Sequence, residues 1–178
     1  HILKHMHADN LVDLLEHLKD GEVKTYLKLL QKHQRSRVLS LLSFDSKSAG
    51  GIMNSEVFTL SNNLTGKNSI GLLQRVSPGT EIRYRIYITN PDGVVVGHTT
   101  LDQLVVNKPD TPLKKLITKN EVNIYAGEDQ EEAVQKMTHY GVLSAPVVDE
   151  KNHFLGIITA DDVLEVLEEE ASEDAYRM

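Results

Sequence analysis

Two stretches of the chain share one pattern: RIYITNPDGVVVGHTTLDQLVV (85–106) and SAPVVDEKNHFLGIITADDVLE (144–165). They align without a gap at an offset of 59 residues, so that Arg85 matches Ser144. Other matched positions keep their chemical character: Ile88 with Val147, Gly97 with Gly156, Thr100 with Thr159, and Leu104 with Val163. In each stretch two β-rich runs flank a turn, and the second run leads into a helical pattern. The repeat predicts two similar units that pack against each other.

The repeat extends upstream, where NSEVFTL (54–60) pairs with KNEVNIY (119–125) at an offset of 65 residues. Each copy therefore reads strand, helix, strand, strand, helix. The β-rich runs predict strands at 85–89, 94–100, 122–126, 145–149 and 154–159. Amphipathic spacing predicts helices at 65–76, 129–139 and 160–176.

Ahead of the repeat, residues 8–43 have the leucine spacing of short amphipathic helices. Gly21 is expected to break the first of them, and further helical pieces are expected around 26–30 and 38–42. The segment SKSAGG (46–51) reads as a turn because of its two glycines. The fold class predicted for the chain is therefore α+β.

Composition limits the possible functions. The 178 residues are 40% hydrophobic and 25% charged, as in ordinary globular proteins. The net charge of −7 argues against nucleic acid or an anionic membrane surface as a partner, and favours cations. The absence of cysteine excludes disulfides and thiolate metal sites.

The sequence offers no pattern for membrane insertion or catalysis. No apolar run reaches the ~18 residues that a membrane span needs, so we expect no direct insertion by this stretch. No arrangement of nucleophile and base indicates an enzyme. Because the chain starts at His1 and ends at Met178 inside a helical pattern, we expect it to be part of a longer polypeptide.

The predicted helix at 160–176 is strongly acidic, with eight carboxylates from Asp161 to Asp174 and no basic residue before Arg177. Like charges three or four positions apart destabilise a helix by roughly a few tenths of a kcal/mol per pair. Helical spacing places these carboxylates on one stripe and one further patch: Asp162, Glu165, Glu169 and Glu173, then Glu170, Glu173 and Asp174. A divalent cation would neutralise them; the alternative is a solvated helix face.

Two tandem copies with GIITADD (156–162) in the second resemble a CBS-domain pair, or Bateman module, over about residues 50–170. The segments around them resemble the cytosolic region of MgtE-type magnesium channels. These segments begin at residues 8, 48, 129 and 163 and read ADNLVDLLEHL, SAGGIM, DQEEAVQKMTHYGVLSAPVVDE and VLEVLEEEASEDAYRM. They occur in the order in which the family has them.

The resemblance implies a domain plan. Residues 1–48 would be the C-terminal part of the helical N domain, 49–108 and 109–169 the two CBS domains, and 170–178 the start of the connecting (plug) helix. The region would dimerise through its CBS pairs on the cytoplasmic side of the inner membrane and be joined to its own transmembrane pore domain. It would sense Mg²⁺ and compact when Mg²⁺ bridges acidic faces between domains.

The same resemblance implies metal-binding roles for ten positions: Asp9, Asp13, Gly51 (through its carbonyl), Asp129, Glu131, Asp162, Glu165, Glu170, Glu173 and Asp174. Structural alternatives stay open for several of them. Asp9 also suits a helix N-cap, Asp129 with Glu132 suits a capping box, and Gly51 suits a turn. Gly141 stands where many family members have an acidic residue, so a metal site relying on that side chain would be missing or weakened.

Thr159 and Asp162 form the T-x-x-D pattern with which CBS modules often hold the ribose and phosphates of adenine nucleotides. The alternative is a capping box with Thr159 at the N-cap. The first copy has Thr100 and Gln103 at these positions, so ATP or a similar nucleotide would have one site per chain. A second functional hypothesis is therefore an adenine-nucleotide-binding CBS regulator of an enzyme or another transporter. A third is a purely structural dimerisation module.

Overall fold

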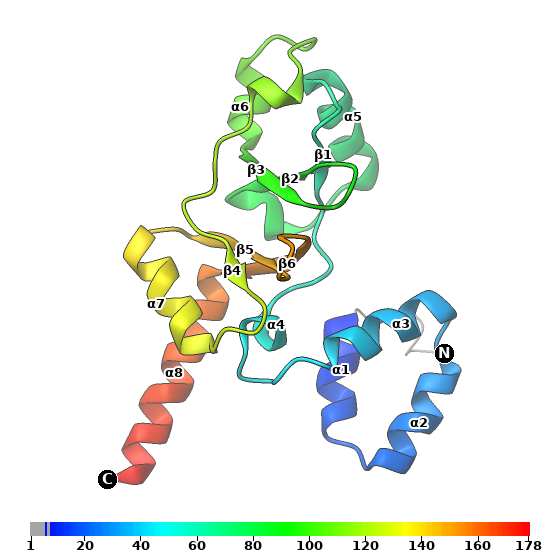
Figure 1. Cartoon of the computed structure of the whole chain (residues 1–178), viewed down its shortest axis with the longest axis vertical. Helices are drawn as coiled ribbons and strands as arrows, with labels where there is room; N and C mark the ends of the chain where they lie inside the picture. The colour runs from blue at the N-terminus through cyan, green and yellow to red at the C-terminus, as the bar shows by residue number, and fades with distance from the viewer. Residues whose placement is uncertain (1–5, 7) are drawn as a thin grey trace.

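The structure of the chain, a computed structural model, describes residue 6 and residues 8–178, apart from the side chains of residues 9, 20, 33 and 36. A helical segment is followed by two α/β units, one for each copy of the repeat (Figure 1). The helical segment comprises α1 (Ala8–Glu16), α2 (Asp20–Leu29) and α3 (Lys32–Leu41). Helices α1 and α3 pack together, and Leu11, Leu15 and Val38 are buried in one cluster.

The break between α1 and α2 falls at residues 17–19, so the prediction that Gly21 breaks the helix is wrong. Gly21 lies in the first turn of α2. The helix starts ahead of it because the carboxylate of Glu22 accepts the backbone N–H of Lys19 at 3.1 Å. This bond satisfies one of the free donors at the helix start.

Gly50 and Gly51 lie in a short helix, α4 (Ala49–Ile52), where a turn was predicted. The hydroxyl of Ser48 accepts the Gly51 N–H and caps this helix. A β-carbon at Gly50 would lie 2.6 Å from the ring of Phe44, and one at Gly51 would overlap the carbonyl of Asp45. Close packing, rather than an unusual backbone conformation, therefore requires the two glycines.

Each copy of the repeat forms a three-stranded sheet covered by helices. The first copy contains β1 (Leu60–Ser61), α5 (Gly66–Val76), β2 (Ile86–Thr89), β3 (Val95–Thr99) and α6 (Leu101–Val106), with 3₁₀ turns at Thr80–Arg83 and Leu113–Lys115. The second contains β4 (Ile124–Tyr125), α7 (Gln130–Tyr140), β5 (Ser144–Val148), β6 (Phe154–Thr159) and α8 (Ala160–Arg177). The predicted helices and strands are confirmed, although β4 is shorter than the predicted 122–126.

The two sheets have the same topology. In each, the first strand is parallel to the second and the second is antiparallel to the third. The strand register is irregular after Ile88 in one sheet and after Val147 in the other, which are matched positions of the repeat. The alignment of the two sequences thus extends to the irregularities of the strands.

The two copies are joined by an exchange of their linkers. Asn54, which leads into the first copy, pairs with Ile157 of the second, and Thr118, which leads into the second, pairs with His98 of the first. Each linker crosses a glycine, Gly156 or Gly97, where a β-carbon would overlap the carbonyl of the crossing residue. The matched glycines of the repeat therefore have the same structural role.

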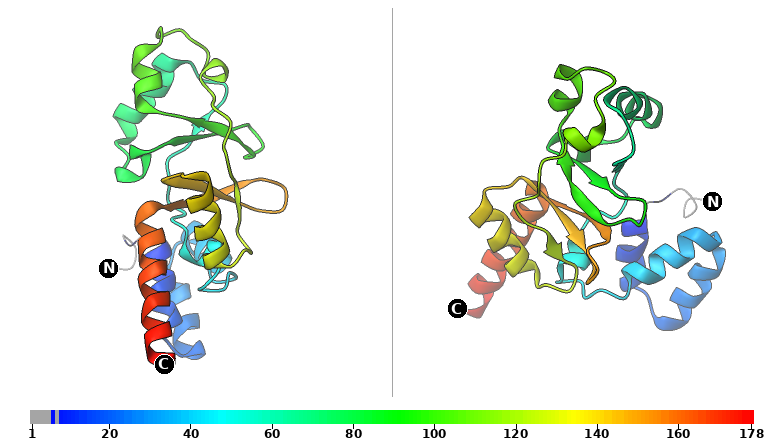
Figure 2. Two further views of the ribbon diagram at one scale, coloured as in Figure 1. Left: turned by 90° about the vertical axis from the view of Figure 1, so that its left-hand side faces the viewer. Right: turned by 45° about the horizontal axis from the view of Figure 1, so that its top comes forward.

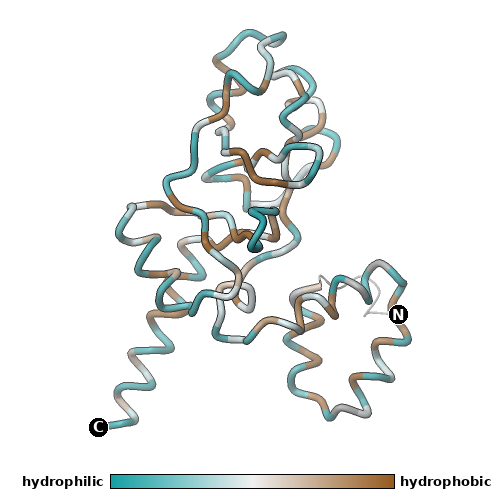
Figure 3. The backbone as a smooth tube through the Cα atoms, in the orientation of Figure 1, coloured by the Kyte–Doolittle hydropathy of each residue, from teal (hydrophilic) through white to brown (hydrophobic). Residues whose placement is uncertain are grey.

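Three buried clusters hold the molecule together. The first copy has a core of its own around Leu60, Ile86 and Leu104. The core of the second copy is continuous with that of the helical segment. A smaller cluster of Tyr87, Val95, Val148 and Ile157 lies between the two sheets, so the prediction that the copies pack together is confirmed. The strands accordingly appear as hydrophobic stretches of the backbone in Figure 3.

Helix α8 leaves the second copy and runs away from its sheet to the C-terminal end of the chain (Figures 1 and 2). It is one continuous helix from Ala160 to Arg177, anchored by the buried side chain of Val166. In the part of the chain that the structure describes, no helix combines the length and apolar character needed to cross a membrane.

Candidate functional site

The first half of α8 borders a polar cavity of about 350 Å³, which is also bordered by α1 and the α4 segment. Five carboxylates line it, two from α1 and three from α8: Asp13, Glu16, Asp162, Glu165 and Glu169. The other lining residues are Ser46, Gly51, Ile52, Met53 and Val166, so no basic side chain lines it among the residues that the structure describes. Four positions predicted for metal binding thus meet in one place: Asp13, Gly51, Asp162 and Glu165. We call this the α1–α8 cavity.

Helical spacing brings the carboxylates to this cavity. Asp13 and Glu16 lie three residues apart and share one face of α1. Asp162, Glu165 and Glu169 follow each other at spacings of three and four on α8 and likewise share a face. The apolar Val166 on the same helix is buried against the body of the protein, and this contact holds the acidic face toward α4.

Asp162 lines the α1–α8 cavity and also caps the start of α8. Its Oδ2 accepts the backbone N–H of Thr159 at 2.7 Å and the Thr159 hydroxyl at 3.1 Å. The helix cap predicted for Thr159 is thus present, with Asp162 as its N3 partner. Burial raises the pKa of Asp162, the two bonds from Thr159 oppose this, and the charges of Glu165 and Asp161 add to it. A cation in the α1–α8 cavity would favour the charged form of this carboxyl.

A second acidic group lies where the start of α7 faces the middle of α8. Asp129 caps α7 by accepting the N–H of Glu131 at 2.8 Å, one residue earlier than the predicted partner Glu132. Glu170 on α8 feels both of these carboxylates: desolvation raises its pKa first, and the charges of Glu131, Asp129, Asp174 and Glu173 raise it further. We call this group the α7–α8 cluster: Asp129, Glu131, Glu170, Glu173 and Asp174.

The α7–α8 cluster includes one poorly satisfied carboxylate, that of Glu170. Its Oε1 atom is shielded from solvent and has no hydrogen-bond partner among the described residues. A shielded carboxylate oxygen without a donor is costly. The donor set of carboxylates alone suits a hard cation such as Mg²⁺.

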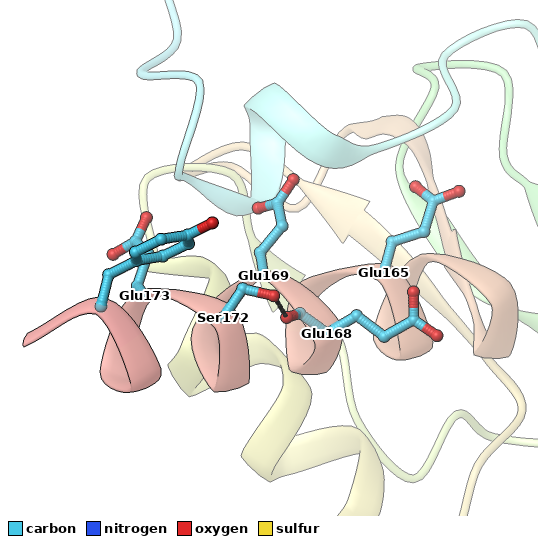
Figure 4. Close-up of a pocket in the computed structure, with 6 residues that line it drawn as sticks. Glu165, Glu168, Glu169, Ser172 and Glu173 are labelled. Atoms are coloured by element: carbon cyan, nitrogen blue, oxygen red, sulfur yellow. Dashed lines mark hydrogen bonds between the residues drawn. The ribbon is translucent and has the colours of Figure 1, made fainter. Parts of the chain in front are cut away.

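A shallow groove of about 540 Å³ runs along α8 and is lined by Glu165, Glu168, Glu169, Ser172, Glu173 and Tyr176. In Figure 4, Glu165 and Glu169 point toward the α4 ribbon, whereas Glu168 extends along the helix. The Ser172 hydroxyl donates to the carbonyl of Glu168 at 2.9 Å and is therefore occupied by its own helix. Glu165 and Glu169 belong to both this groove and the α1–α8 cavity.

The spacing of these carboxylates suits a hydrated ion better than a bare one. Among the described residues, no three side chains of His, Cys, Asp or Glu converge closely enough to hold a metal ion directly. Mg²⁺ usually keeps several of its waters and binds through one or two carboxylates. The two acidic groups therefore fit a hydrated Mg²⁺ that bridges separate parts of the chain.

Of the ten predicted positions, four lie at the α1–α8 cavity and five in the α7–α8 cluster. The side chain of Asp9 lies outside the described residues. Because α1 includes Ala8, Asp9 falls within the first turn and is not the N-cap residue.

The prediction missed Glu16 as a cavity residue, although its spacing of three from Asp13 is a usable signal. Glu169 was placed on the acidic stripe of α8 but not among the ten metal-binding positions. The prediction also missed Lys47. The Nζ of this residue lies 2.6 Å from Glu173 Oε1. No local pattern could reveal that pair, because the two residues are 126 positions apart.

Comparisons with known proteins agree with this architecture. Residues 1–47 match the family model described as MgtE intracellular N domain, and residues 113–169 match the CBS domain. The magnesium transporter MgtE of Thermus thermophilus is 32% identical over 96% of this chain and 38% of its own length. MgtE of Enterococcus faecalis is also 32% identical, over 79% of this chain and 31% of its own length. The chain thus spans less than two fifths of these relatives.

Solved structures give the same result. The soluble part of a magnesium transporter superposes with a TM-score of 0.84 at 32% identity, covering 93% of this chain and 65% of the other. The cytosolic domain of the Mg²⁺ channel MgtE in complex with ATP superposes with a TM-score of 0.81 at 30% identity, covering 90% and 66%. The predicted α+β fold with a tandem CBS pair is confirmed. The chain therefore belongs to the MgtE family and corresponds to its cytosolic region, the intracellular N domain followed by the CBS pair.

Proposed function

We propose that this chain senses Mg²⁺ for a magnesium transporter and controls the transmembrane pore of that protein from the cytoplasmic side of the membrane. The α1–α8 cavity carries this proposal, because carboxylates from two separate helices converge there and no basic side chain lines it among the described residues. In this proposal residues 1–48 belong to the N domain, 49–108 and 109–169 form the CBS domains, and 170–178 begin the connecting helix.

The switch is electrostatic. Without a cation, Asp13 on α1 and Asp162, Glu165 and Glu169 on α8 repel one another across the cavity, and this repulsion favours separation of the N domain from α8. Bound Mg²⁺ supplies positive charge that cancels the repulsion. The compact arrangement is favoured only to the extent that its acidic faces bind the ion more tightly than the separated ones do.

Several weak sites acting together make the response steep. A tenfold difference in affinity between two states shifts their equilibrium by about 1.4 kcal/mol for each site. The α1–α8 cavity and the α7–α8 cluster both involve α8, so their contributions add on one helix. Through this helix the position of the N domain is passed on to the pore.

A homodimer formed through the CBS pairs completes the proposal. Large apolar side chains are exposed on the helices of both copies: Leu101, Val105 and Val106 on α6, Tyr140 and Leu143 at the end of α7, and Leu164 and Leu167 on α8. Val105 and Leu164 occupy matched positions of the repeat. Exposed apolar groups of this kind mark an interaction surface, and a second copy of the chain offers the matching one.

The test is a Mg²⁺ titration followed by thermal unfolding and by solution radius, against sodium chloride at matched ionic strength. We expect saturable stabilisation and a smaller radius with Mg²⁺ alone. A hundredfold excess over the dissociation constant stabilises by about 2.7 kcal/mol for each site. Equal responses to both salts would reject Mg²⁺ sensing and leave a structural dimerisation module.

Charge reversal on α8 distinguishes binding of Mg²⁺ at the α7–α8 cluster from a general effect of the net charge of the protein. The variant E170K/E173K/D174K should lose Mg²⁺-dependent compaction, because it removes three carboxylates of the α7–α8 cluster. The matched control E81K/D92K/D110K makes the same charge change in the first copy, away from both acidic groups, and should still compact. Compaction that persists in the α8 variant would show that this cluster takes no part.

ATP is a second candidate ligand, because a related cytosolic domain was solved in complex with it. At the predicted position, however, Asp162 lies beside Glu165 and Glu169, so nucleotide phosphates would be repelled there unless Mg²⁺ accompanied them. ATP titrations of wild type and D162N, with and without Mg²⁺, distinguish the cases. Binding of ATP without Mg²⁺ that is lost in D162N would support the nucleotide regulator.

A further inference from the structure

Lys47 lies in the turn between α3 and α4 and reaches the acidic face of α8. Its Nζ is 2.6 Å from Glu173 Oε1, and both side chains are about half exposed. The backbone of Lys47 is held in place: its N–H donates to Asp45 Oδ1 at 2.8 Å, and its carbonyl accepts the N–H of Gln130 at 2.8 Å. The lysine is therefore fixed at the point where the N domain, α7 and α8 meet.

The pair changes the charge balance of the α7–α8 cluster. The Lys47 ammonium group donates to Glu173 Oε1 at 2.6 Å, so its positive charge offsets the negative charge of that carboxylate. Arg177 lies 3.8 Å from the other oxygen of Glu173. By contrast, the neighbouring Glu170 has a shielded oxygen with no partner among the described residues. One carboxylate of the cluster is thus neutralised by the protein itself, and the next one is not.

We propose that Lys47 is a built-in competitor for the cation at Glu173. Its ammonium group occupies the position at Glu173 Oε1 that a hydrated Mg²⁺ would otherwise take. Binding of the ion at this end of α8 is therefore an exchange, in which Lys47 releases Glu173. The inference rests on the proposed function and adds a residue that sets the Mg²⁺ concentration at which the sensor responds.

The exchange also gives the lysine a role when Mg²⁺ is scarce. While it is bound to Glu173, it ties α8 to the turn ahead of α4 and shields one of the repelling charges. Exposed ion pairs contribute little to stability, so removal of Lys47 should leave the fold intact. The effect of its removal should therefore appear in cation affinity and not in unfolding.

The test compares K47Q with the wild type by isothermal titration calorimetry with MgCl₂ at constant ionic strength. We expect K47Q to bind Mg²⁺ about two- to fivefold more tightly, since the strength of an exposed ion pair limits the competition. The control K114Q makes the same charge change on an exposed lysine of the first copy, for which no ion pair is recorded among the described residues, and should bind as the wild type does.

A third variant decides whether the effect passes through Glu173. In an E173Q background, the further change K47Q should have no effect on Mg²⁺ affinity. Equal affinities of K47Q and K114Q, or weaker binding by K47Q than by the wild type, would overturn the competitor role while leaving Mg²⁺ sensing in place. If the wild type itself shows no saturable binding, the proposed function fails, and the role of Lys47 fails with it.

Discussion

The buried contact between the two copies of the repeat includes one hydroxyl pair. Tyr87 Oη lies 3.0 Å from Ser144 Oγ, and both residues are fully buried. Burial raises the pKa of Tyr87 to about 12, so the hydroxyl stays protonated at all ordinary pH values. The pair joins β2 of the first copy to β5 of the second.

Replacement of Tyr87 by Phe should destabilise the protein by about 1–3 kcal/mol, because it leaves the buried Ser144 hydroxyl without a partner. Urea unfolding at equilibrium measures the loss. The double variant Y87F/S144A removes both hydroxyls and should recover part of the lost stability. A Y87F protein as stable as the wild type would show that Ser144 is satisfied in another way.

His98 gives the stability of the first copy a pH dependence. Burial lowers the pKa of His98 below 6.5, and the charge of Arg85 lowers it further. The bond that the ring Nδ1–H donates to Asn120 Oδ1 at 2.8 Å opposes this, as does the charge of Glu121. The unfolded chain therefore takes up the proton first as the pH falls. The contribution of neutral His98 is complete above about pH 6.5 and is lost as the pH falls from there toward the lower pKa of the folded state.

Unfolding free energies of wild type and H98Q between pH 5 and 8 test this. The wild type should lose more stability than H98Q as the pH falls below about 6.5. If the unfolding free energies of the two proteins changed in parallel with pH, His98 would not be the source of the pH-dependent stability.

For individual residues, the sequence predicted contacts between near neighbours in the chain better than contacts between distant positions. The caps formed by Asp129 and by Thr159 with Asp162 depend on neighbours two or three residues away, so spacing alone revealed them. The contact of Lys47 with Glu173 depends on how the N domain docks beside α8, and no local pattern encodes that.

Among the elements, the crossing of linker and strand is the tightest contact between the copies. At Gly97, φ is +149° and a β-carbon would meet the Thr118 carbonyl and, at 2.5 Å, the side chain of Ile117. At Gly156 a β-carbon would meet the Asn54 carbonyl. Backbone atoms cannot move aside at either crossing without breaking the pairing of the linker.

Replacement of Gly97 or Gly156 by Ala should therefore destabilise the protein by about 1–3 kcal/mol. Gly71 is the matched control: it lies inside α5 with open space around its α-carbon, and its replacement by Ala should stabilise by about 0.5–1 kcal/mol. Equilibrium unfolding in urea measures all three variants. Equal effects at the three positions would contradict the close approach of the linkers.

The repeat made most elements predictable, because each strand and helix of one copy has a counterpart in the other. The predictions failed where packing overrides local preference. Gly50 and Gly51 promote turns in isolation, yet they form a helical turn because only glycine fits beside Phe44 and Asp45. Gly21 does not break the helix for a different, local reason: the cap between Lys19 and Glu22 starts α2 ahead of it.

Over the whole molecule, charge is divided unevenly. Residues 62–119 contain eight basic and four acidic side chains, for a net charge of +4. Residues 120–178 contain three basic and fifteen acidic ones, for a net charge of −12. The acidic excess lies where α7 and α8 form the proposed Mg²⁺ sites, so the field of the whole second copy attracts cations toward them.

The proposed dimer gives a further prediction. Leu164 is 59% exposed on α8, so L164D should weaken dimerisation without unfolding the protein. L29D, at a position on α2 that is 55% exposed, is the matched control and should not change the oligomeric state. Sedimentation velocity over a range of protein concentrations gives the result. A monomeric wild type would refute the dimer, and an unaffected L164D would move its interface elsewhere.

The exchange of linkers between the two copies also bears on how such a molecule can arise and be divided. Residue 54 completes the second copy and residue 118 completes the first, although each precedes the other unit in the chain. A fragment holding one copy would keep a linker with nothing to pair with and leave a strand edge open to other chains. We therefore expect the two copies to fold as a pair, so that deletion of either one destabilises the other.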